Sequence, residues 1–170
     1  MIILIYLVAI ISANVVTAAF APIIAGPFIV PWGTLLIGAT FILRDLVQRN
    51  YGRSNAYNAI VTALVLSTVT SFLLGDSLMI VLASALSFAI SETADTEIFT
   101  RLRASFAKRV LFSGVIGGTI DSTIFVIVGL SPLGAGFLPW TAIPSAIIGQ
   151  MAVKFAMQTV GVAVIFKYMK

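Results

Sequence analysis

The stretch "SLMIVLASALSFAISETADTEIFTRLR", Ser77 to Arg103, decides the class of this protein. It begins with an apolar run close to the ~20 residues that a helix needs to cross a hydrocarbon core. It ends with three acids, Glu92, Asp95 and Glu97, and two arginines. The acids either lie in water at the end of a membrane helix or are held inside the bilayer for a purpose.

The rest of the chain has the same apolar character. Of the 170 residues 60% are hydrophobic and only 9% are charged, against roughly 25% charged in soluble domains. The apolar runs lack the alternation of barrel strands, so helices are expected. We predict an all-α integral membrane protein, with one domain (1–170) of six transmembrane helices at about 2–21, 32–47, 55–74, 77–99, 110–130 and 141–166.

Basic residues predict the orientation. They lie between the second and third spans, between the fourth and fifth, and at the C-terminus. By the positive-inside rule both termini are cytoplasmic, in the cell inner (plasma) membrane. The first span has no charged leader and no cleavage site, so we interpret it as a retained helix. This sidedness accounts for the net charge of +4, and no nucleic-acid partner is expected.

Composition narrows the chemistry. Cys and His are both absent, which argues against disulfides, zinc and haem, so no cofactor or metal is expected. The loop from Ala21 to Gly33 contains three prolines and two glycines without any charge. It is either a plain turn or a re-entrant segment, since irregular backbone at membrane depth must lie beside protein or water.

Several charged residues lie deep in the predicted spans. At ~1.5 Å per residue, Asp95 is roughly 9 Å from the cytoplasmic arginines, Glu92 roughly 13 Å and Asp121 roughly 18 Å. Lys154 is also near the middle, whereas Glu97 is shallow enough for solvation. A charge at the bilayer centre costs about 3 kcal/mol on insertion scales, so such residues are usually paired or functional. Lys154 with Asp121 could be a structural ion pair, but the acids outnumber the deep base.

Helical spacing gathers these residues into polar faces. Gln150, Lys154 and Gln158 repeat at i, i+4 and i+8, and Ser84, Ser87 and Ser91 extend the stripe of Glu92 and Asp95. The Gly114-x-x-x-Gly118 motif predicts close helix packing. A D-[ST]-x-I-F pattern occurs twice, and it places Phe99 and Phe125 one turn from a carboxylate. An aromatic face beside a carboxylate suits a flat heterocycle with N–H donors.

Four motifs in order carry a resemblance to a known family: "SAN" at 12–14, "PWGT…FILRDLVQRNYG" at 31–52, "SFAISETADTEIFTRLR" at 87–103 and "DSTIF" at 121–125. This set is similar to the vitamin-uptake-transporter (VUT) family, which includes the YhhQ-type queuosine-precursor transporters. The resemblance implies a six-helix importer of 7-deazaguanine bases. One departure is Gln48, which replaces a glutamate of that pattern, so the ligand need not be identical.

The motif positions name the polar candidates for substrate binding, and the aromatic and stripe residues complete the set. The predicted substrate-binding residues are Asn14, Asp45, Phe88, Glu92, Asp95, Asp121, Phe125, Gln150 and Lys154. By default Arg44 with Asp45 is interpreted as a pair at the membrane interface, and Asn14 could simply bind a neighbouring helix. The expected partners are a 7-deazapurine-like small molecule, the lipid bilayer and, because the chain is small, a second copy in a homodimer.

The sequence leaves the energy source open. It has no Walker A motif and no G-x-S-x-G, so ATP hydrolysis and serine-hydrolase chemistry are not expected and the protein is not expected to be an enzyme. The favoured function is a gradient-driven or facilitative importer. The alternative is a substrate-binding S-component of an energy-coupling-factor transporter, whose topology is similar and which needs separate ATPase subunits.

Overall fold

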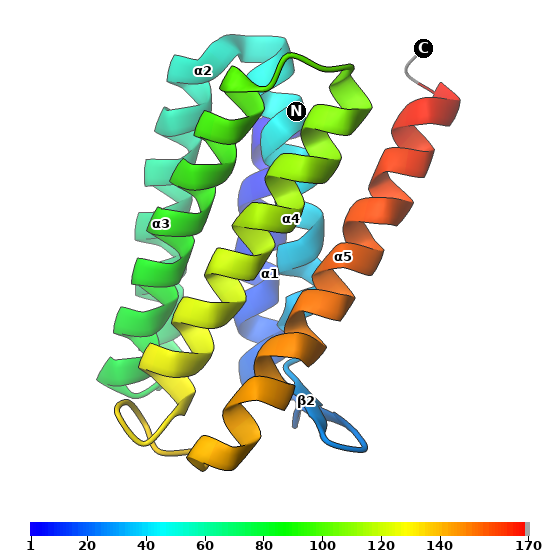
Figure 1. The fold of residues 1–170 in the computed structure, drawn as a ribbon. Coiled ribbons are helices and arrows are strands. Elements are labelled where there is room, and N and C mark those ends of the chain that lie inside the picture. Colours follow the sequence, from blue (N-terminus) through cyan, green and yellow to red (C-terminus); the bar gives the residue numbers. More distant parts are fainter. Residues whose placement is uncertain (169–170) are drawn as a thin grey trace.

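The computed structural model describes residues 1–168 and is a bundle of long helices (Figure 1). Within these residues five helices are long and apolar enough to cross a membrane, which confirms the all-helical membrane class. The helices are α1 (Ile2–Ala19), α2 (Gly33–Leu73), α3 (Leu78–Arg101), α4 (Phe106–Ile124) and α5 (Ile143–Tyr168). The short elements are the strands β1 (Ile23–Ala25) and β2 (Phe28–Val30), the π-helical turn η1 (Phe125–Leu130) after α4 and the 3-10 turn η2 (Trp140–Ala142) before α5.

Helix α2 is interrupted at Gly52. This residue has φ 85° and ψ 169°, a backbone conformation that is essentially limited to glycine. Figure 1 shows α2 folding back on itself near the end of the bundle that holds the N-terminus. The interruption falls in the polar segment that the sequence predicts between the spans 32–47 and 55–74, and it leaves helical stretches at 33–51 and 53–73.

The segment 21–33 is more ordered than the plain turn considered from its sequence. It forms a β-hairpin, in which Ile23 pairs with Val30 and Ala25 with Phe28. Gly26 at the tip has φ 59°. The hairpin packs against α5, where Gly149 leaves the room: a Cβ at that position would meet Phe28 Cβ and Val30 Cγ2 at 3.1 Å. The hairpin thus satisfies its own backbone hydrogen bonds and covers one end of the bundle.

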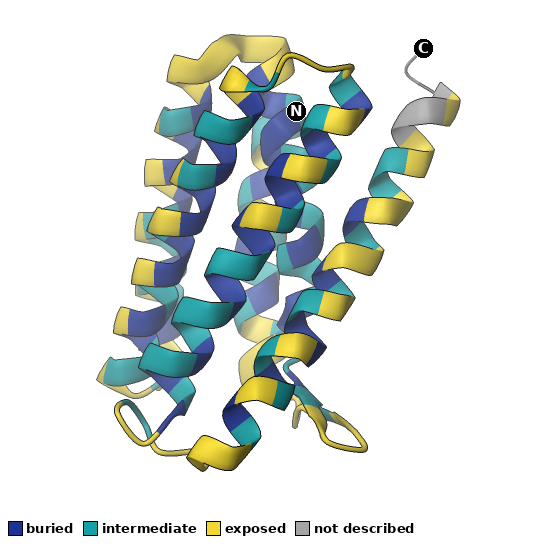
Figure 2. Cartoon of the chain, in the orientation of Figure 1, coloured by how far each residue is buried: buried dark blue, intermediate teal, exposed yellow. Residues whose placement is uncertain are grey.

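The bundle is apolar outside and polar inside. Large aliphatic side chains face outward in stripes, as on α2, where Val61, Val65 and Val69 are 60%, 56% and 50% exposed. The buried residues lie on the inward faces of the helices (Figure 2), and they include both apolar side chains and fully buried charged ones such as Arg44 and Asp95. This arrangement suits a lipid solvent, because lipid accepts the apolar exterior and polar groups must find partners inside.

We expect Gly52→Ala to destabilise the fold by about 1–3 kcal/mol, because alanine strongly disfavours the backbone conformation at this position. A Cβ there would meet nothing within 4 Å, so the cost would come from the backbone alone. The apparent melting temperature in detergent should fall by roughly 2–10 °C. Ser54→Ala, at an exposed helical position in the same turn, is the control. Equal melting temperatures of Gly52→Ala and Ser54→Ala would show that alanine at position 52 does not strain the backbone.

Candidate functional site

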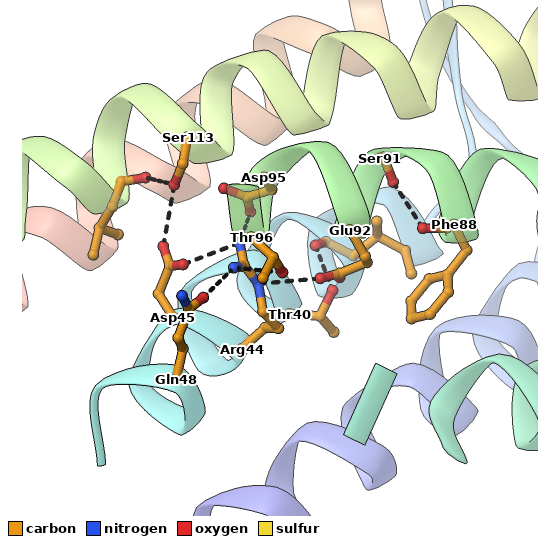
Figure 3. Close-up of polar contacts among 12 residues, drawn as sticks. Thr40, Arg44, Asp45, Gln48, Phe88, Ser91, Glu92, Asp95, Thr96 and Ser113 are labelled. Atoms are coloured by element: carbon orange, nitrogen blue, oxygen red, sulfur yellow. Dashed lines mark hydrogen bonds and ion pairs between the residues drawn. The ribbon is translucent and has the colours of Figure 1, made fainter. Parts of the chain in front are cut away.

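The interior contains a cluster of four charged side chains, named here the Arg44 cluster: Arg44, Asp45, Glu92 and Asp95 (Figure 3). Arg44 Nη2 pairs with Asp45 Oδ1 at 3.0 Å and also with Asp95, and Nε lies 3.2 Å from Glu92 Oε2. The four side chains are at most 1% exposed. The Arg44 cluster therefore joins α2 to α3 through buried ion pairs.

Neutral groups complete the surroundings of Arg44. Nη1 donates to Gln48 Oε1 and to Thr96 Oγ1, both at 3.0 Å. The Ser113 hydroxyl of α4 lies 3.5 Å from Asp45 Oδ2. All three guanidinium nitrogens thus face acceptors, and α4 also contacts the cluster.

The Arg44–Asp45 pair considered from the sequence is present, with Nη2 and Oδ1 3.0 Å apart. Both side chains are 0% exposed. Position along the helix suggested the surface, since Arg44 lies only about 12 Å of helical rise from the turn at Gly52. The sequence did not show that three carboxylates from two helices surround this guanidinium, which is the condition under which a buried arginine is tolerated.

A polar cleft of about 90 Å³ lies between the helices toward the hairpin end of the bundle. At ~10–15 Å³ of such volume per water molecule, it has room for several waters or a small polar molecule. Five helices, η1 and the segment after β2 contribute to its wall: the lining includes Asn14 and Thr17 of α1, Thr34, Ser67 and Ser71 of α2, Ser84, Ser87 and Phe88 of α3, Asp121 of α4, Phe125 of η1 and Gln150 and Lys154 of α5.

One wall of the cleft carries a buried ion pair. Lys154 Nζ lies 2.6 Å from Asp121 Oδ2 and donates to Ser122 Oγ at 2.7 Å. The Asp121 side chain is 12% exposed, against 3% for Lys154. The structural pair considered from the sequence is therefore present, and both of its members also line the cleft.

The other cleft residues differ in how far their polar groups are satisfied. Asn14 Nδ2 donates to the Ser67 hydroxyl at 2.8 Å and to the Ser67 carbonyl at 3.1 Å, so it does bind a neighbouring helix. Gln150 is 2% exposed, and its Nε2 has no hydrogen-bond partner. A buried donor without a partner costs about 1–3 kcal/mol, and a ligand in the cleft could supply the missing acceptor.

Three predicted binding residues, Asp45, Glu92 and Asp95, do not line the cleft. They surround Arg44 instead. On α3, Glu92 and Asp95 lie one helical turn or more after Phe88, and Asp45 is on α2. The two D-[ST]-x-I-F motifs also separate. Phe125 lines the cleft, whereas Phe99 packs edge-on against Phe106 with ring centroids 5.8 Å apart. The same local pattern thus serves a cleft in one case and a packing core in the other.

Sequence reasoning found the cleft serines of α3 but missed the cleft hydroxyls of α1 and α2. Ser67 and Ser71 are one turn apart on α2, and Thr17 is one turn beyond Asn14 on α1. The i, i+4 spacing of the two serines and the i, i+3 spacing of Asn14 and Thr17 were the available signals, because polar residues on one face of an apolar helix indicate a polar interior face.

The glycine motif of α4 has the packing role expected for it. A Cβ at Gly118 would touch the Lys154 side chain at 3.4 Å, and a Cβ at Gly114 would collide with the Gln158 side chain. The polar stripe of α5 therefore reaches the interior across the glycine face of α4. On its outer side, small and apolar residues leave a shallow groove between the two helices, lined by Gly114, Val115, Gly118, Thr119, Ile148, Met151, Ala152, Lys154 and Phe155.

Glu97, which we expected to be solvated, lies apart from both sites. Its side chain is 24% exposed. It pairs with Arg53 and, at 3.2 Å, with Arg101, and it accepts a hydrogen bond from the Tyr57 hydroxyl at 2.6 Å. These residues lie near the end of the bundle opposite the hairpin.

A multi-pass membrane bundle with a polar cleft between its helices is the architecture of a membrane transporter. The chain belongs to the family described as "Putative vitamin uptake transporter", whose model matches residues 70–168. The matched part includes α3, α4 and α5 and so contains Glu92, Asp95, Asp121, Gln150 and Lys154. No curated protein and no solved structure matches the chain.

We expect Arg44→Met to destabilise the protein by about 3–5 kcal/mol, because three buried carboxylates would lose their counter-charge. Arg101→Met is the matched control. Its ion pair is at the surface, where the arginine side chain is 81% exposed, so its loss should cost no more than about 1 kcal/mol. Thermal unfolding of both variants in detergent measures the difference. Similar losses in the two variants would show that the Arg44 cluster is not a main support of the fold.

Proposed function

We propose that this protein imports a planar nucleobase of the 7-deazaguanine class, such as a queuosine precursor, as a gradient-driven or facilitative carrier. The family supports uptake of a small substrate. The observation that carries the finer proposal is that one cleft is lined by both the Asp121 carboxylate and the Gln150 amide nitrogen, which has no hydrogen-bond partner. A carboxylate accepts N–H donors and an amide nitrogen donates, which is the complement of a guanine-like edge.

A 7-deazaguanine ring presents two N–H donors and a carbonyl oxygen along one edge. We propose that Asp121 accepts from the ring N–H and the 2-amino group, as carboxylates do in bidentate pairs. Gln150 Nε2 would donate to the carbonyl oxygen, which gives this buried donor its partner. Phe88 and Phe125 offer ring faces for the flat heterocycle, and Asn14 and Lys154 complete the polar wall. The base crosses without chemical change and without a cofactor.

The remaining predicted site residues receive a different role in this proposal. Asp45, Glu92 and Asp95 are held by Arg44 between the cleft and the basic end of the bundle. We propose that the Arg44 cluster closes the route from the cleft to the cytoplasm. Opening would require these ion pairs to exchange or separate, as a carrier with alternating access needs on one side of its site.

We further propose a single domain with six spans, with the two helical stretches of α2 as the second and third spans, in the inner membrane. The α3–α4 connection, the turn at Gly52, the start of α1 and the last described turn of α5 lie at one end of the bundle (Figure 1). The basic residues near these connections support a cytoplasmic location for that end. The cleft would then open toward the outside. The homodimer stays a prediction.

Binding to purified protein tests the site. We expect 7-cyano-7-deazaguanine to raise the melting temperature of the wild type. Gln150→Ala should weaken binding about tenfold, because it removes one buried hydrogen-bond donor. Gln158→Ala is the control: Gln158 lies two turns further along α5, donates to the Gly38 carbonyl at 3.3 Å and does not line the cleft. A panel that includes guanine and adenine tests the class of base.

Transport by cells that lack their own precursor transporter gives the second readout. Asp121→Asn should take up labelled precursor more slowly than the wild type, since the variant loses the charged acceptor. Equal uptake by the two proteins would rule out Asp121 as a substrate ligand. If no purine or deazapurine stabilises the wild type, the proposed substrate class is wrong.

Single cysteines test the topology, because the natural chain has none. We expect Ser54→Cys and Ala104→Cys to react with a membrane-impermeant maleimide only from the cytoplasmic side. Leu133 lies between η1 and η2 and is 68% exposed. Leu133→Cys should therefore react only from outside. Labelling of intact cells and of inverted vesicles distinguishes the outer side of the membrane from the cytoplasmic side. Reaction of Ser54→Cys and Leu133→Cys from the same side would exclude the six-span arrangement.

One observation favours a second function, the S-component of an energy-coupling-factor transporter. The shallow α4–α5 groove is lined by Gly114, Gly118 and Ala152, and small residues on membrane helices allow another helix to approach closely. A coupling subunit could pack there. Uptake of the base by proteoliposomes that contain this protein alone, without ATPase subunits, would exclude this alternative.

A further inference from the structure

The Arg44 cluster has an excess of negative charge. If each group carries its ordinary charge, three carboxylates face one guanidinium, and −3 with +1 gives −2. The side chains are at most 1% exposed, so water does not compensate this charge. Lys154, the other deeply buried cation of the described chain, is paired with Asp121 and bonded to Ser122. An uncompensated charge in a low-dielectric interior is strongly unfavourable, and a buried acid commonly responds by binding a proton.

A metal ion is not the missing cation. Among the residues that the structure describes, no three His, Cys, Asp or Glu side chains are arranged to hold one. The carboxylates instead point at the guanidinium from different sides (Figure 3). A proton, which needs only one carboxylate oxygen and one neighbouring acceptor, fits this geometry.

We propose that the Glu92 carboxyl is a proton-binding site and that this proton drives substrate import. The contacts with Arg44 distinguish Glu92 from the other two acids of the Arg44 cluster. Asp45 and Asp95 share the Nη2 group of Arg44 and Asp45 also has Ser113 within 3.5 Å, whereas Glu92 has one arginine contact, at 3.2 Å. Neither Arg44 Nε nor Glu92 Oε2 has a hydrogen-bond partner, so the 3.2 Å contact between them is not a hydrogen bond that requires a charged Glu92.

An independent observation comes from Tyr6 of α1. Its hydroxyl group is buried beside Glu92, the side chain is 0% exposed, and the hydroxyl has no hydrogen-bond partner. A hydroxyl both donates and accepts. Tyr6 can therefore accept a hydrogen bond from a protonated Glu92 or donate one to the carboxylate, which gives the proton site a partner in both states.

The surroundings define what competes for the proton. The titratable groups facing Glu92 are Tyr6 from α1, Arg44 and Asp45 from α2, Asp95 on its own helix and Asp121 from α4. Asp121 is already compensated by Lys154, which leaves Glu92 as the proton acceptor nearest the cleft.

Its place on α3 links the proton to transport. Phe88, one turn before Glu92, lines the cleft. A proton from outside would reach Glu92 through the cleft together with the substrate. When the cytoplasmic side opens, water reaches Glu92, the proton leaves to the more alkaline cytoplasm, and the carboxylate pairs fully with Arg44 again. One proton enters with one neutral base, so each cycle restores the starting protonation state of Glu92 and moves one positive charge inward. This coupling rests on the proposed import function, whereas the proton site does not.

Infrared spectroscopy tests the proton site without any substrate. At neutral pH the purified wild type should show the carbonyl band of a buried protonated carboxyl group, which shifts in heavy water. Glu92→Gln, which matches a protonated glutamate in shape, should fold and lose this band. Glu97→Gln, a change on the same helix at a surface ion pair, should keep it. Absence of the band in the wild type, or its persistence in Glu92→Gln, would overturn the proposal.

Proteoliposomes loaded with a pH-sensitive dye test the coupling. An inward proton gradient should drive accumulation of labelled 7-cyano-7-deazaguanine at least tenfold above the level without a gradient, with acidification of the lumen. Glu92→Gln should still bind the base, because Glu92 does not line the cleft, and should still exchange it across the membrane, because glutamine matches the protonated carboxyl in shape; it should lose the gradient-driven accumulation. Glu97→Gln should retain all three activities.

The two proposals fail in different ways. Gradient-driven accumulation by Glu92→Gln at the wild-type level would refute proton coupling through this residue. If the wild type neither binds nor exchanges the base, the proposed substrate is wrong, and the infrared measurement still decides whether Glu92 holds a proton.

Discussion

Arg44 carries the greatest electrostatic constraint in this structure. A guanidinium with no exposed surface in the middle of a membrane bundle is tolerated only because carboxylates from α2 and α3 surround it and neutral oxygens of Gln48 and Thr96 take its remaining N–H groups. Each partner depends on the others, since removal of one leaves an uncompensated buried charge. The relative placement of α2 and α3, with Ser113 of α4 beside them, follows from this requirement. The cleft walls on the same helices are positioned as a consequence.

The interior is organised as two polar layers along the helix axes. The cleft lies toward the hairpin, and the Arg44 cluster lies toward the basic end. Helix α3 contributes to both, with Phe88 in the cleft wall and Glu92 in the cluster one turn later. A carrier requires that a site open to one side be closed to the other. A charge cluster closes a route more reversibly than an apolar core, because ion pairs can exchange partners or bind a proton without unpacking the helices.

Much of the fold could be predicted from apolar runs and charge alone, because the lipid solvent demands helices of a set length and polar groups that face inward. The deep positions of Asp121 and Lys154 were also readable, since helical rise gives depth. Helical rise does not show which residues of different helices are neighbours in space. Arg44 looked interfacial because two of its three carboxylates, those of Glu92 and Asp95, come from a helix that is distant in sequence. Phe99 and Phe125 have the same local motif and opposite fates for the same reason. The β-hairpin at 23–30 escaped prediction because its two strands are too short for a periodic signal.

The Asp121–Lys154 pair limits what the cleft can accept. Both residues line it, but the carboxylate is the more exposed partner, at 12% against 3%. The Lys154 stem passes close to Gly118, where a Cβ would lie 3.4 Å from it, and its ammonium group is turned toward Asp121 and Ser122. A solute in the cleft therefore meets mainly a carboxylate oxygen. Anionic solutes such as phosphorylated or carboxylated vitamins would meet like charge, whereas neutral or cationic solutes with paired N–H donors would gain charge-assisted hydrogen bonds. Within a family of vitamin transporters, this polarity favours a base over an acid.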